Sequence, residues 1–206
     1  MVRRLTPDDR RAEIIARTHE MIATRGAEGL SLRKTARWCG MSAPGLLHHF
    51  SDLTTLLEAV LTERAQQEAC AYSRAIAEID ALGTRATLRD LADITVRITA
   101  ERGLESVNFD RLEMHALTDP AHPLHDYFAA GHSTRLLRPL ILELVEREYE
   151  NTTAVIAMLG LVTEGLRRRW LRTTGLPHFE ADWHAVRDTV FQSLECFRKE
   201  TVLAAA

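Results

Sequence analysis

Apolar residues recur at intervals of three and four along nearly the whole chain, which is the spacing that places them on one face of an α-helix. Thr6 and Pro7 predict the start of a first helix, because they suit an N-cap and the first helical position. Gly26 and Gly29 then predict a short connection that closes this helix. The apolar face of the first helix comprises Ile14, Ile15, Thr18, Met21 and Ile22.

Capping residues predict three further helices between Ser31 and Ile79. Ser31 is expected to cap a second helix that runs to about Cys39, and Gly40 stops it. Ser42 then caps a third helix of about two turns, with a proline in its first turn where a missing N–H costs little. Asp52 caps a longer fourth helix, whose apolar face repeats at helical spacing to around Ile79.

The second and third of these helices are short and separated by a tight turn, which is the form of a helix-turn-helix. Ala36 is small enough for close helix crossing, Gly40 permits the turn, and Leu46 anchors the second helix of the pair. Spacing alone leaves a second interpretation open, because a helical hairpin with a purely structural role would show the same loose pattern.

The rest of the chain predicts more helices and no strand, repeat or low-complexity segment. The expected helices cover residues 87–102, 105–117, 122–148, 152–172 and 180–200. Pro139 is expected to kink or split the helix over 122–148, because its ring removes one hydrogen bond and collides with a preceding carbonyl. The sequence therefore predicts an all-α fold.

Composition excludes two broad classes of protein. The chain has 206 residues, of which 46% are hydrophobic and 27% charged, with a net charge of -3, so it can bury a sizeable core and is not of the disordered class. No apolar run approaches the ~20 residues needed to span a bilayer. Cys39, Cys70 and Cys196 form no C-x-x-C pair, and the chain begins without a secretory signal, which predicts reduced thiols and a cytoplasmic protein.

Charge is distributed unevenly along the chain. Residues 1–52 hold nine Lys and Arg against six Asp and Glu, whereas the remainder holds 17 basic and 23 acidic residues. A small basic segment on a larger acidic body suggests that a polyanion would bind the N-terminal part.

The enzyme motifs that the sequence begins are incomplete, which predicts a protein that is not an enzyme. His19-Glu20 begins an H-E-x-x-H zinc motif, but Ala23 occupies the place of the second histidine. Gly40 to Pro44 begins a G-x-S-x-G motif and ends in proline.

The sequence predicts no metal site and no cofactor. Asp119, His115, His122, His125 and His132 are close in sequence and could ligate a metal, but solvated histidines at a helix junction fit their turn-forming neighbours better.

The stretch from Leu32 to Phe50, with the helices before and after it, resembles the DNA-binding domain of TetR-family transcriptional regulators. The residues that carry the resemblance are Gly26, Ser31, Ala36, Gly40, Ser42, Leu46, His49, Phe50, Leu56 and Leu57. The resemblance implies an N-terminal three-helix helix-turn-helix DNA-binding domain over 1–52, joined to a larger helical ligand-binding and dimerisation domain over 53–206.

The resemblance also implies how DNA is bound. A homodimer would insert its two recognition helices, residues 42–49, into successive major grooves of a palindromic operator. Arg33 is the main candidate for reading a base, because arginine can bind guanine through two hydrogen bonds. The full predicted DNA-binding set is Arg33, Lys34, Arg37, Ser42, Ala43, Pro44, Gly45, Leu47, His48 and His49.

Two positions depart from the family pattern. Leu47 stands where the family commonly has a tyrosine, and Leu53 where it commonly has a lysine; both usual residues contact phosphate. These departures predict weaker or less salt-sensitive DNA binding. A flexible arginine segment, comprising Arg3, Arg4, Arg10 and Arg11, could partly compensate along the backbone or groove.

The C-terminal part is expected to bind a small-molecule effector and to form the dimer. Helices near 152–172 and 180–200 carry apolar stripes that would pack as a four-helix bundle with the partner subunit. The predicted ligand-binding residues mix aromatic, apolar and polar types, as pockets do, and are Phe109, Leu112, His115, Tyr127, Met158 and Val162. The alternative is a helical small-molecule-binding or interaction protein whose DNA-binding domain has lost its function.

Overall fold

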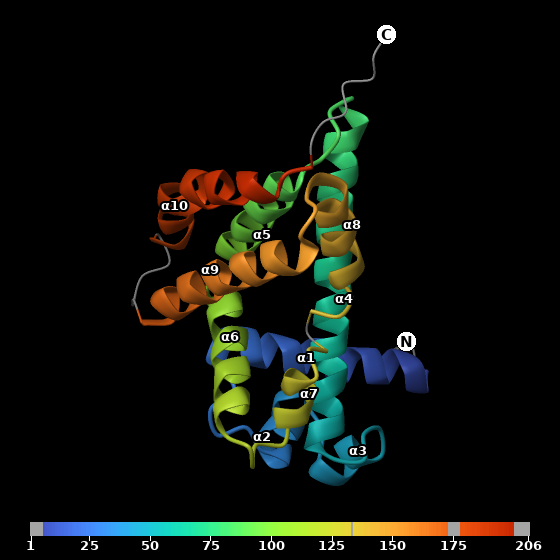
Figure 1. The fold of residues 1–206 in the computed structure, drawn as a ribbon. Coiled ribbons are helices and arrows are strands. Elements are labelled where there is room, and N and C mark those ends of the chain that lie inside the picture. The colour runs from blue at the N-terminus through green and yellow to red at the C-terminus, as the bar shows by residue number, and fades with distance from the viewer. Residues whose placement is uncertain (1–5, 133, 173–177, 200–206) are drawn as a thin grey trace. The chain divides into compact units, whose positions relative to one another are not determined.

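The computed structural model describes residues 6–132, 134–172 and 178–199, and these residues fold into helices (Figure 1). The helices are α1 (Pro7–Arg25), α2 (Leu32–Trp38), α3 (Ala43–Leu47), α4 (Leu53–Ala81), α5 (Leu88–Arg102), α6 (Leu104–Thr118), α7 (His125–Ala129), α8 (Arg138–Glu148), α9 (Thr152–Arg172), α10 (His178–Leu194) and the short 3₁₀ helix η1 (Glu195–Phe197). Over the described ranges the structure has no strand, and the predicted all-α fold is confirmed.

Polar side chains cap the N-terminal helices as the sequence predicts. The Thr6 hydroxyl accepts a hydrogen bond from the Asp9 amide at 3.1 Å, and the Asp9 carboxylate accepts one from the Thr6 amide at 3.2 Å. The hydroxyl of Ser42 accepts from the backbone of its own helix, and Asp52 accepts from the Thr55 amide at 2.7 Å. These bonds satisfy amides that have no partner within the helix, so they fix where each helix begins.

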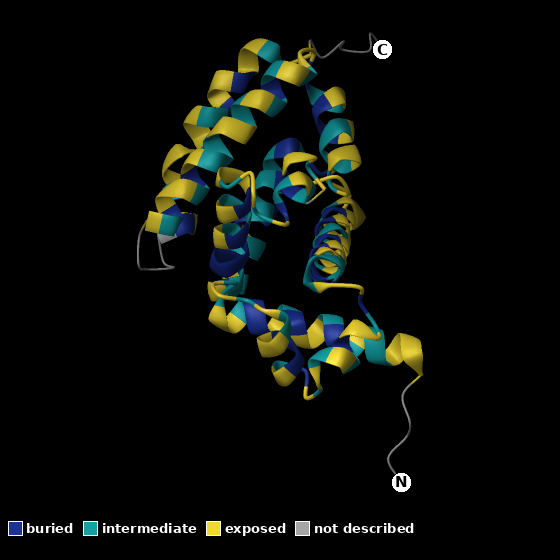
Figure 2. Ribbon diagram, turned by 90° about the horizontal axis from the view of Figure 1, so that it is seen from below, coloured by how far each residue is buried: buried dark blue, intermediate teal, exposed yellow. Residues whose placement is uncertain are grey.

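The chain forms two compact units, and α4 runs from one into the other. The first unit comprises residues 1–68 and 103–136, and the second comprises residues 69–102 and 137–206. In both units the helices carry alternating buried and exposed positions and are not buried all round (Figure 2). This alternation matches the amphipathic pattern read from the sequence.

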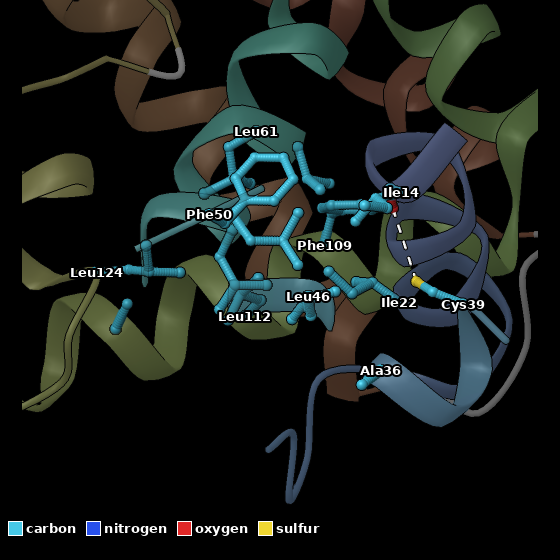
Figure 3. Close-up of a cluster of buried hydrophobic side chains, with 14 of the residues drawn as sticks. Ile14, Ile22, Ala36, Cys39, Leu46, Phe50, Leu61, Phe109, Leu112 and Leu124 are labelled. Atoms are coloured by element: carbon cyan, nitrogen blue, oxygen red, sulfur yellow. Dashed lines mark hydrogen bonds between the residues drawn. The ribbon is translucent and has the colours of Figure 1, made fainter. Parts of the chain in front are cut away.

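The core of the first unit joins the three N-terminal helices to α4, α6 and α7. Ile14, Ile22, Leu46 and Phe50 are buried in it together with Phe109 of α6 (Figure 3). Other buried members come from α4, α6 and the segment that leads into α7, and include Leu56, Val60, Leu112 and Leu124. The helix-turn-helix therefore shares one core with α6, a segment distant in sequence.

The second unit is built from the C-terminal part of α4 with α5, α8, α9, α10 and η1. Trp183 is 1% exposed, and its indole N–H donates to Asp93 of α5 at 2.6 Å. Arg187 contacts the other oxygen of that carboxylate at 3.0 Å. Trp170 of α9 stacks on Phe179 of α10, with 4.5 Å between ring centroids. Aromatic rings and one shared carboxylate thus hold α5, α9 and α10 together.

The prediction of one helix over 122–148 is wrong in its extent, because the structure has two shorter helices, α7 and α8, in this range. Residues 119–124 form a turn, so α7 begins only at His125, and the described residues 130–132 and 134–137 are not helical either. Gly131 adopts φ 69° just after α7, a left-handed conformation that ends a helix. Pro139 lies in the first turn of α8, where its missing N–H costs nothing, so it helps to begin a helix and does not kink one. The third helix is also shorter than predicted, at five residues.

Candidate nucleic-acid interface

The turn between α2 and α3 has the geometry of a helix-turn-helix. Gly40 adopts φ 70°, and its amide donates to the Arg37 carbonyl at 3.0 Å while the Met41 amide donates to the Ala36 carbonyl at 2.9 Å. This pair of bonds is the Schellman motif, which closes α2 and reverses the chain. Ala36 and Leu46 are 1% and 0% exposed, so the small residue and the apolar anchor occupy the positions that the sequence predicts for them.

Arg11 of α1 fixes the far end of α3. Its guanidinium lies 3.9 Å from the centre of the Phe50 ring and donates a hydrogen bond to the His49 carbonyl. The Leu46 side chain packs in the core below, and the Ser42 hydroxyl accepts from the Gly45 amide at 3.1 Å at the near end. The short third helix is therefore held at both ends by side chains.

The basic residues of α2 differ in their freedom to contact DNA. Arg33 and Arg37 are exposed and one helical turn apart, and neither has a partner among the residues that the structure describes. Lys34 is exposed as well, but its ammonium donates to the Gly29 carbonyl at 2.8 Å. Two guanidinium groups thus share one outer face of α2, and Lys34 stabilises the loop before it.

The outer surface of α3 is small and weakly polar. Ser42 and Pro44 are exposed, Ala43 and Gly45 are half-buried, and the Ser42 hydroxyl already serves as the helix cap. Leu47, 43% exposed, is one of the few large apolar side chains left open to solvent.

The two histidines at the end of α3 differ in exposure. The His48 ring is exposed and the His49 ring is half-buried, with 5.3 Å between their centroids. His48 is therefore the more accessible polar side chain of the predicted DNA-binding set on this helix.

The predicted flexible arginine segment is wrong for its two described members. Arg10 and Arg11 lie within α1, where Arg10 pairs with Glu13 at 2.6 Å and Arg11 packs on Phe50. The capping box at Thr6 starts α1 before these residues, which explains why they are helical. Arg3 and Arg4 lie outside the described residues.

A hydrogen bond between α6 and α1, which the sequence pattern did not predict, also positions the N-terminal helices. Asn108 of α6 is 6% exposed, and its amide donates to the Ala23 carbonyl near the end of α1 at 2.9 Å. Nothing in the pattern around Asn108 signals this bond, because the two residues are 85 positions apart. The bond joins α6 directly to the helix that carries Arg11.

The residues predicted to bind a ligand fall into both units. Leu112 and His115 line a cleft of about 640 Å³ in the first unit. Phe109 is buried in the core, 4.3 Å from the Arg64 guanidinium, and Tyr127 stacks on His132 at 5.0 Å. Burial raises the pKa of Tyr127. Met158 and Val162 are half-buried on α9 and belong to the second unit.

The histidines around the α6–α7 turn are close to one another, yet the described part of the chain has no group of three or more His, Cys, Asp or Glu placed to hold a metal. His115 and His122 have ring centroids 5.0 Å apart. The His122 Nδ1 accepts a hydrogen bond from the Leu124 amide, and the His125 ring is bonded to the Ala116 carbonyl. These rings thus take part in the turn.

Residues 14–60 match the sequence model of the family described as bacterial regulatory proteins, tetR family. The matched segment covers most of α1, all of α2 and α3, and the first turns of α4, so it contains the helix-turn-helix of α2 and α3 and parts of the helices on either side. The chain carries a TetR-family N-terminal domain. No curated protein matches the sequence at a significant level.

Solved structures extend the similarity beyond this domain to the whole fold of the chain. A protein from Rhodococcus sp. assigned to the TetR-family transcriptional regulators is 24% identical with a TM-score of 0.63, covering 88% of this chain and 97% of its own. The fatty acid degradation regulator FadR from Bacillus halodurans is 14% identical, with a TM-score of 0.61 and coverage of 93% and 96%. The multidrug binding protein EbrR, complexed with imidazole, is 21% identical, with a TM-score of 0.58 and coverage of 90% and 94%. The chain therefore has the fold of a TetR-family transcriptional regulator.

In the described ranges, α4 and the other helices are all too polar or too short for a membrane span.

Proposed function

We propose that this protein is a site-specific, ligand-responsive transcriptional regulator, most simply a repressor, that acts in the cytoplasm as a homodimer on a palindromic operator. The observation that carries the proposal is the pair of exposed guanidinium groups of Arg33 and Arg37, which have no partner among the described residues, beside an α3 of small outer residues. An arrangement of this kind combines positive charge with a helix that can approach base edges closely.

The predicted contacts divide into reading and positioning roles. Arg33, at the start of α2, would bind guanine, whereas Arg37 would contact phosphate and so set register and salt dependence. Ala43, Pro44 and Gly45 would allow close approach or contact a thymine methyl group, and His48 would supply a polar contact to a base edge. Lys34 uses one of its three ammonium N–H groups on the Gly29 carbonyl, so it would contact phosphate with the remaining two or by leaving that carbonyl.

Exposed apolar side chains on the last two long helices support the dimer. Leu161 of α9 is 76% exposed and Val186 of α10 is 36% exposed. Adding a Cβ to Gly160 or Gly165 would meet no atom within 4 Å, so a partner helix would find a smooth surface there. Packing of α9 and α10 against the same helices of a second copy would bury these residues and hold two α3 helices about 34 Å apart, or a multiple of that distance.

Regulation would work by a shift of population between two states of the dimer. The two neighbours named for fatty acid degradation and for multidrug binding support a small-molecule effector. An effector that binds one state better would change the spacing of the recognition helices through α4, which joins the two units. Phe109, Leu112, His115, Tyr127, Met158 and Val162 remain the proposed ligand-binding residues.

Selection of bound sequences from a random duplex library at near-physiological salt tests this function. We expect one palindrome to be enriched, and Arg33→Ala to weaken its binding about 5- to 150-fold, since a bidentate contact to guanine contributes about 1–3 kcal/mol. Arg74→Ala is the matched control, because Arg74 is an exposed arginine of α4 that belongs to the second unit. Equal losses in the two variants would contradict the assignment of Arg33.

Two leucines favour a second function, because their side chains cannot donate a hydrogen bond to a DNA phosphate. Leu47 is exposed on α3 and Leu53 begins α4, where the family pattern has a tyrosine and a lysine. If the folded dimer enriches no sequence, the favoured alternative is a helical small-molecule-binding or interaction protein whose helix-turn-helix domain does not bind DNA.

A further inference from the structure

A cleft of about 640 Å³ opens in the first unit beside the helix-turn-helix. Its walls come from four segments: the loop between α1 and α2, the first turns of α4, the outer face of α6, and the turn that follows α6. Leu57, Leu112 and Asn108 are 6%, 4% and 6% exposed and form its buried base. The volume lies in the range of sites that take small molecules.

The apolar part of the lining comes from α4, α6 and the α1–α2 loop. Leu30 and Leu53 are half-buried and add to the surface of Leu57 and Leu112. Four leucines from three separate segments therefore offer one apolar wall. A ring or a short alkyl chain placed against it would remove that surface from water.

The remaining part of the lining is rich in groups that carry or can accept positive charge. Arg111 and His115 lie one turn apart on α6, and the His115 ring contacts His122 at 5.0 Å between centroids. Arg111 is exposed and has no partner in the described part of the chain. Arg25, the last residue of α1, also lines the cleft and has its guanidinium 4.6 Å from the centre of the Trp38 ring, and Glu28 is the acidic member of the lining.

His122 is held in a way that leaves one ring nitrogen for a ligand. Its Nδ1 accepts a hydrogen bond from the Leu124 amide at 3.1 Å, so Nε2 carries the proton of the neutral ring. Burial lowers the pKa of His122, and the neighbouring His115 and His125 lower it further, while Asp119 opposes them. The His122 ring is thus biased toward its neutral form in the free protein.

We propose that this cleft binds a small amphipathic organic acid, whose carboxylate is held by Arg111, His115 and His122 and whose apolar body lies against the leucine wall. A carboxylate pairs with a guanidinium through parallel hydrogen bonds and accepts a further bond from an imidazole N–H. A neutral ligand would leave Arg111 without a counter-charge, and a bare inorganic anion would leave the leucines in water. The regulatory meaning of the site rests on the proposed function; the binding itself does not.

The experiment is isothermal titration calorimetry of the full chain at pH 6.5 with 2-naphthoate, 2-naphthamide and inorganic phosphate as probes. We expect one site per chain for 2-naphthoate, with an affinity at least about tenfold higher than for the other two. Equal binding of the amide would overturn recognition of the acid, and equal binding of phosphate would overturn the role of the apolar wall. Failure of 2-naphthoate to bind below about 1 mM would overturn the site.

Two arginine variants locate the binding. Arg111→Gln is expected to weaken 2-naphthoate at least about tenfold, because it removes the charged end of the contact. Arg74→Gln, an exposed arginine of the second unit, is the matched control and should leave the affinity unchanged. A similar loss in both would mean that the acid binds elsewhere by general charge. Imidazole NMR signals of His115 and His122 should shift on addition of the acid, and signals that do not move would contradict the assignment.

The pH dependence of binding has a defined sign. A bound carboxylate favours the imidazolium form, so it raises the pKa of His122 above its lowered value in the free protein. Binding is therefore accompanied by proton uptake, and the affinity should increase as the pH falls from 8 to 6, where the acid itself stays ionised. The charged and titratable groups around this ring are Arg111, His115 and Asp119 of α6 and its C-cap, His125 of α7, and Arg25 and Glu28 near the α1–α2 loop.

His122→Asn tests this direction of the pH dependence and should preserve the α6–α7 turn. The asparagine oxygen can accept from the Leu124 amide in place of Nδ1 but cannot be protonated, so the pH dependence should flatten. A wild-type affinity that does not change with pH would overturn the role of His122. Selection of DNA by the ligand-free protein remains a separate measurement, so loss of acid binding and loss of DNA binding can be told apart.

Discussion

Leu46 and Leu47 are adjacent leucines with opposite surroundings, and together they test whether the helix-turn-helix is packed as described. Leu46 is 0% exposed and lies in the core with Ile14, Ile22 and Phe50, whereas Leu47 is 43% exposed. Both positions are in α3, and the substitution to alanine removes the same atoms and changes helix propensity by the same small amount. Any difference between the two variants therefore reports on packing.

The expected magnitudes differ by several kcal/mol. Leu46→Ala removes a fully buried side chain and leaves a cavity, which costs about 2–5 kcal/mol of the free energy of unfolding. Leu47→Ala should change it by about 0.5 kcal/mol or less, as surface substitutions do. Because small proteins have about 5–15 kcal/mol in total, the first variant loses a large share of its stability and the second loses almost none.

Hydrogen exchange followed by mass spectrometry measures the two units separately. Amides such as those of Cys39 and Phe50, which are bonded to the Thr35 and Leu46 carbonyls, should exchange about thirtyfold faster or more in Leu46→Ala. Peptides from α9 and α10 provide the internal control for the second unit. Equal acceleration in the two variants would refute the packing of α3, and so would an unchanged exchange rate in Leu46→Ala.

Three further predictions follow from single contacts. Leu47→Tyr would add a hydroxyl that can donate to phosphate, so binding to the selected operator should tighten about fivefold, and fluorescence anisotropy that shows no change would contradict the phosphate contact. Asp93→Ala leaves the buried Trp183 indole N–H without its acceptor and should cost about 1–3 kcal/mol in urea unfolding, whereas Asp188→Ala, at a carboxylate whose side chain is 72% exposed, should cost less than about 1 kcal/mol. The hydrogen bond from the Thr55 amide lowers the pKa of Asp52. The cap therefore stabilises the fold above the ordinary carboxyl pKa, and this stabilisation is lost as the pH falls through the lowered pKa. Thermal unfolding between pH 5 and 2.5 should show this loss of stability in the wild type and not in Asp52→Asn.

Local signals made most of the helix boundaries predictable. Thr6, Ser31, Ser42 and Asp52 cap helices through bonds to amides three residues ahead, so everything that decides those starts is contained in a few neighbouring positions. Gly40 is equally local, since only its own φ and the carbonyls of α2 are involved. The same reasoning failed after Thr118, because the bonds of the α6–α7 turn compete with continuation of a helix and periodicity does not detect them.

Contacts between distant residues were out of reach for the same reason. The bonds of Arg11 to His49 and of Asn108 to Ala23 join residues 38 and 85 positions apart, and no spacing rule relates them. Of the predicted ligand-binding residues, Leu112 and His115 meet in one cleft, but the sequence could not supply its other wall, the α1–α2 loop. A site assembled from separate segments needs the tertiary fold before its lining can be named.

These two distant contacts also connect the cleft with the recognition helix. Asn108 lines the cleft and holds the end of α1 through the Ala23 carbonyl, and Arg11 near the start of the same helix holds the end of α3. A 19-residue helix spans about 28 Å and moves as a rigid rod, so a shift at one end reaches the other. A helix of five residues such as α3 has too few internal bonds to resist this shift. A ligand that displaces Asn108 would therefore act on the recognition helix through α1, within the first unit itself.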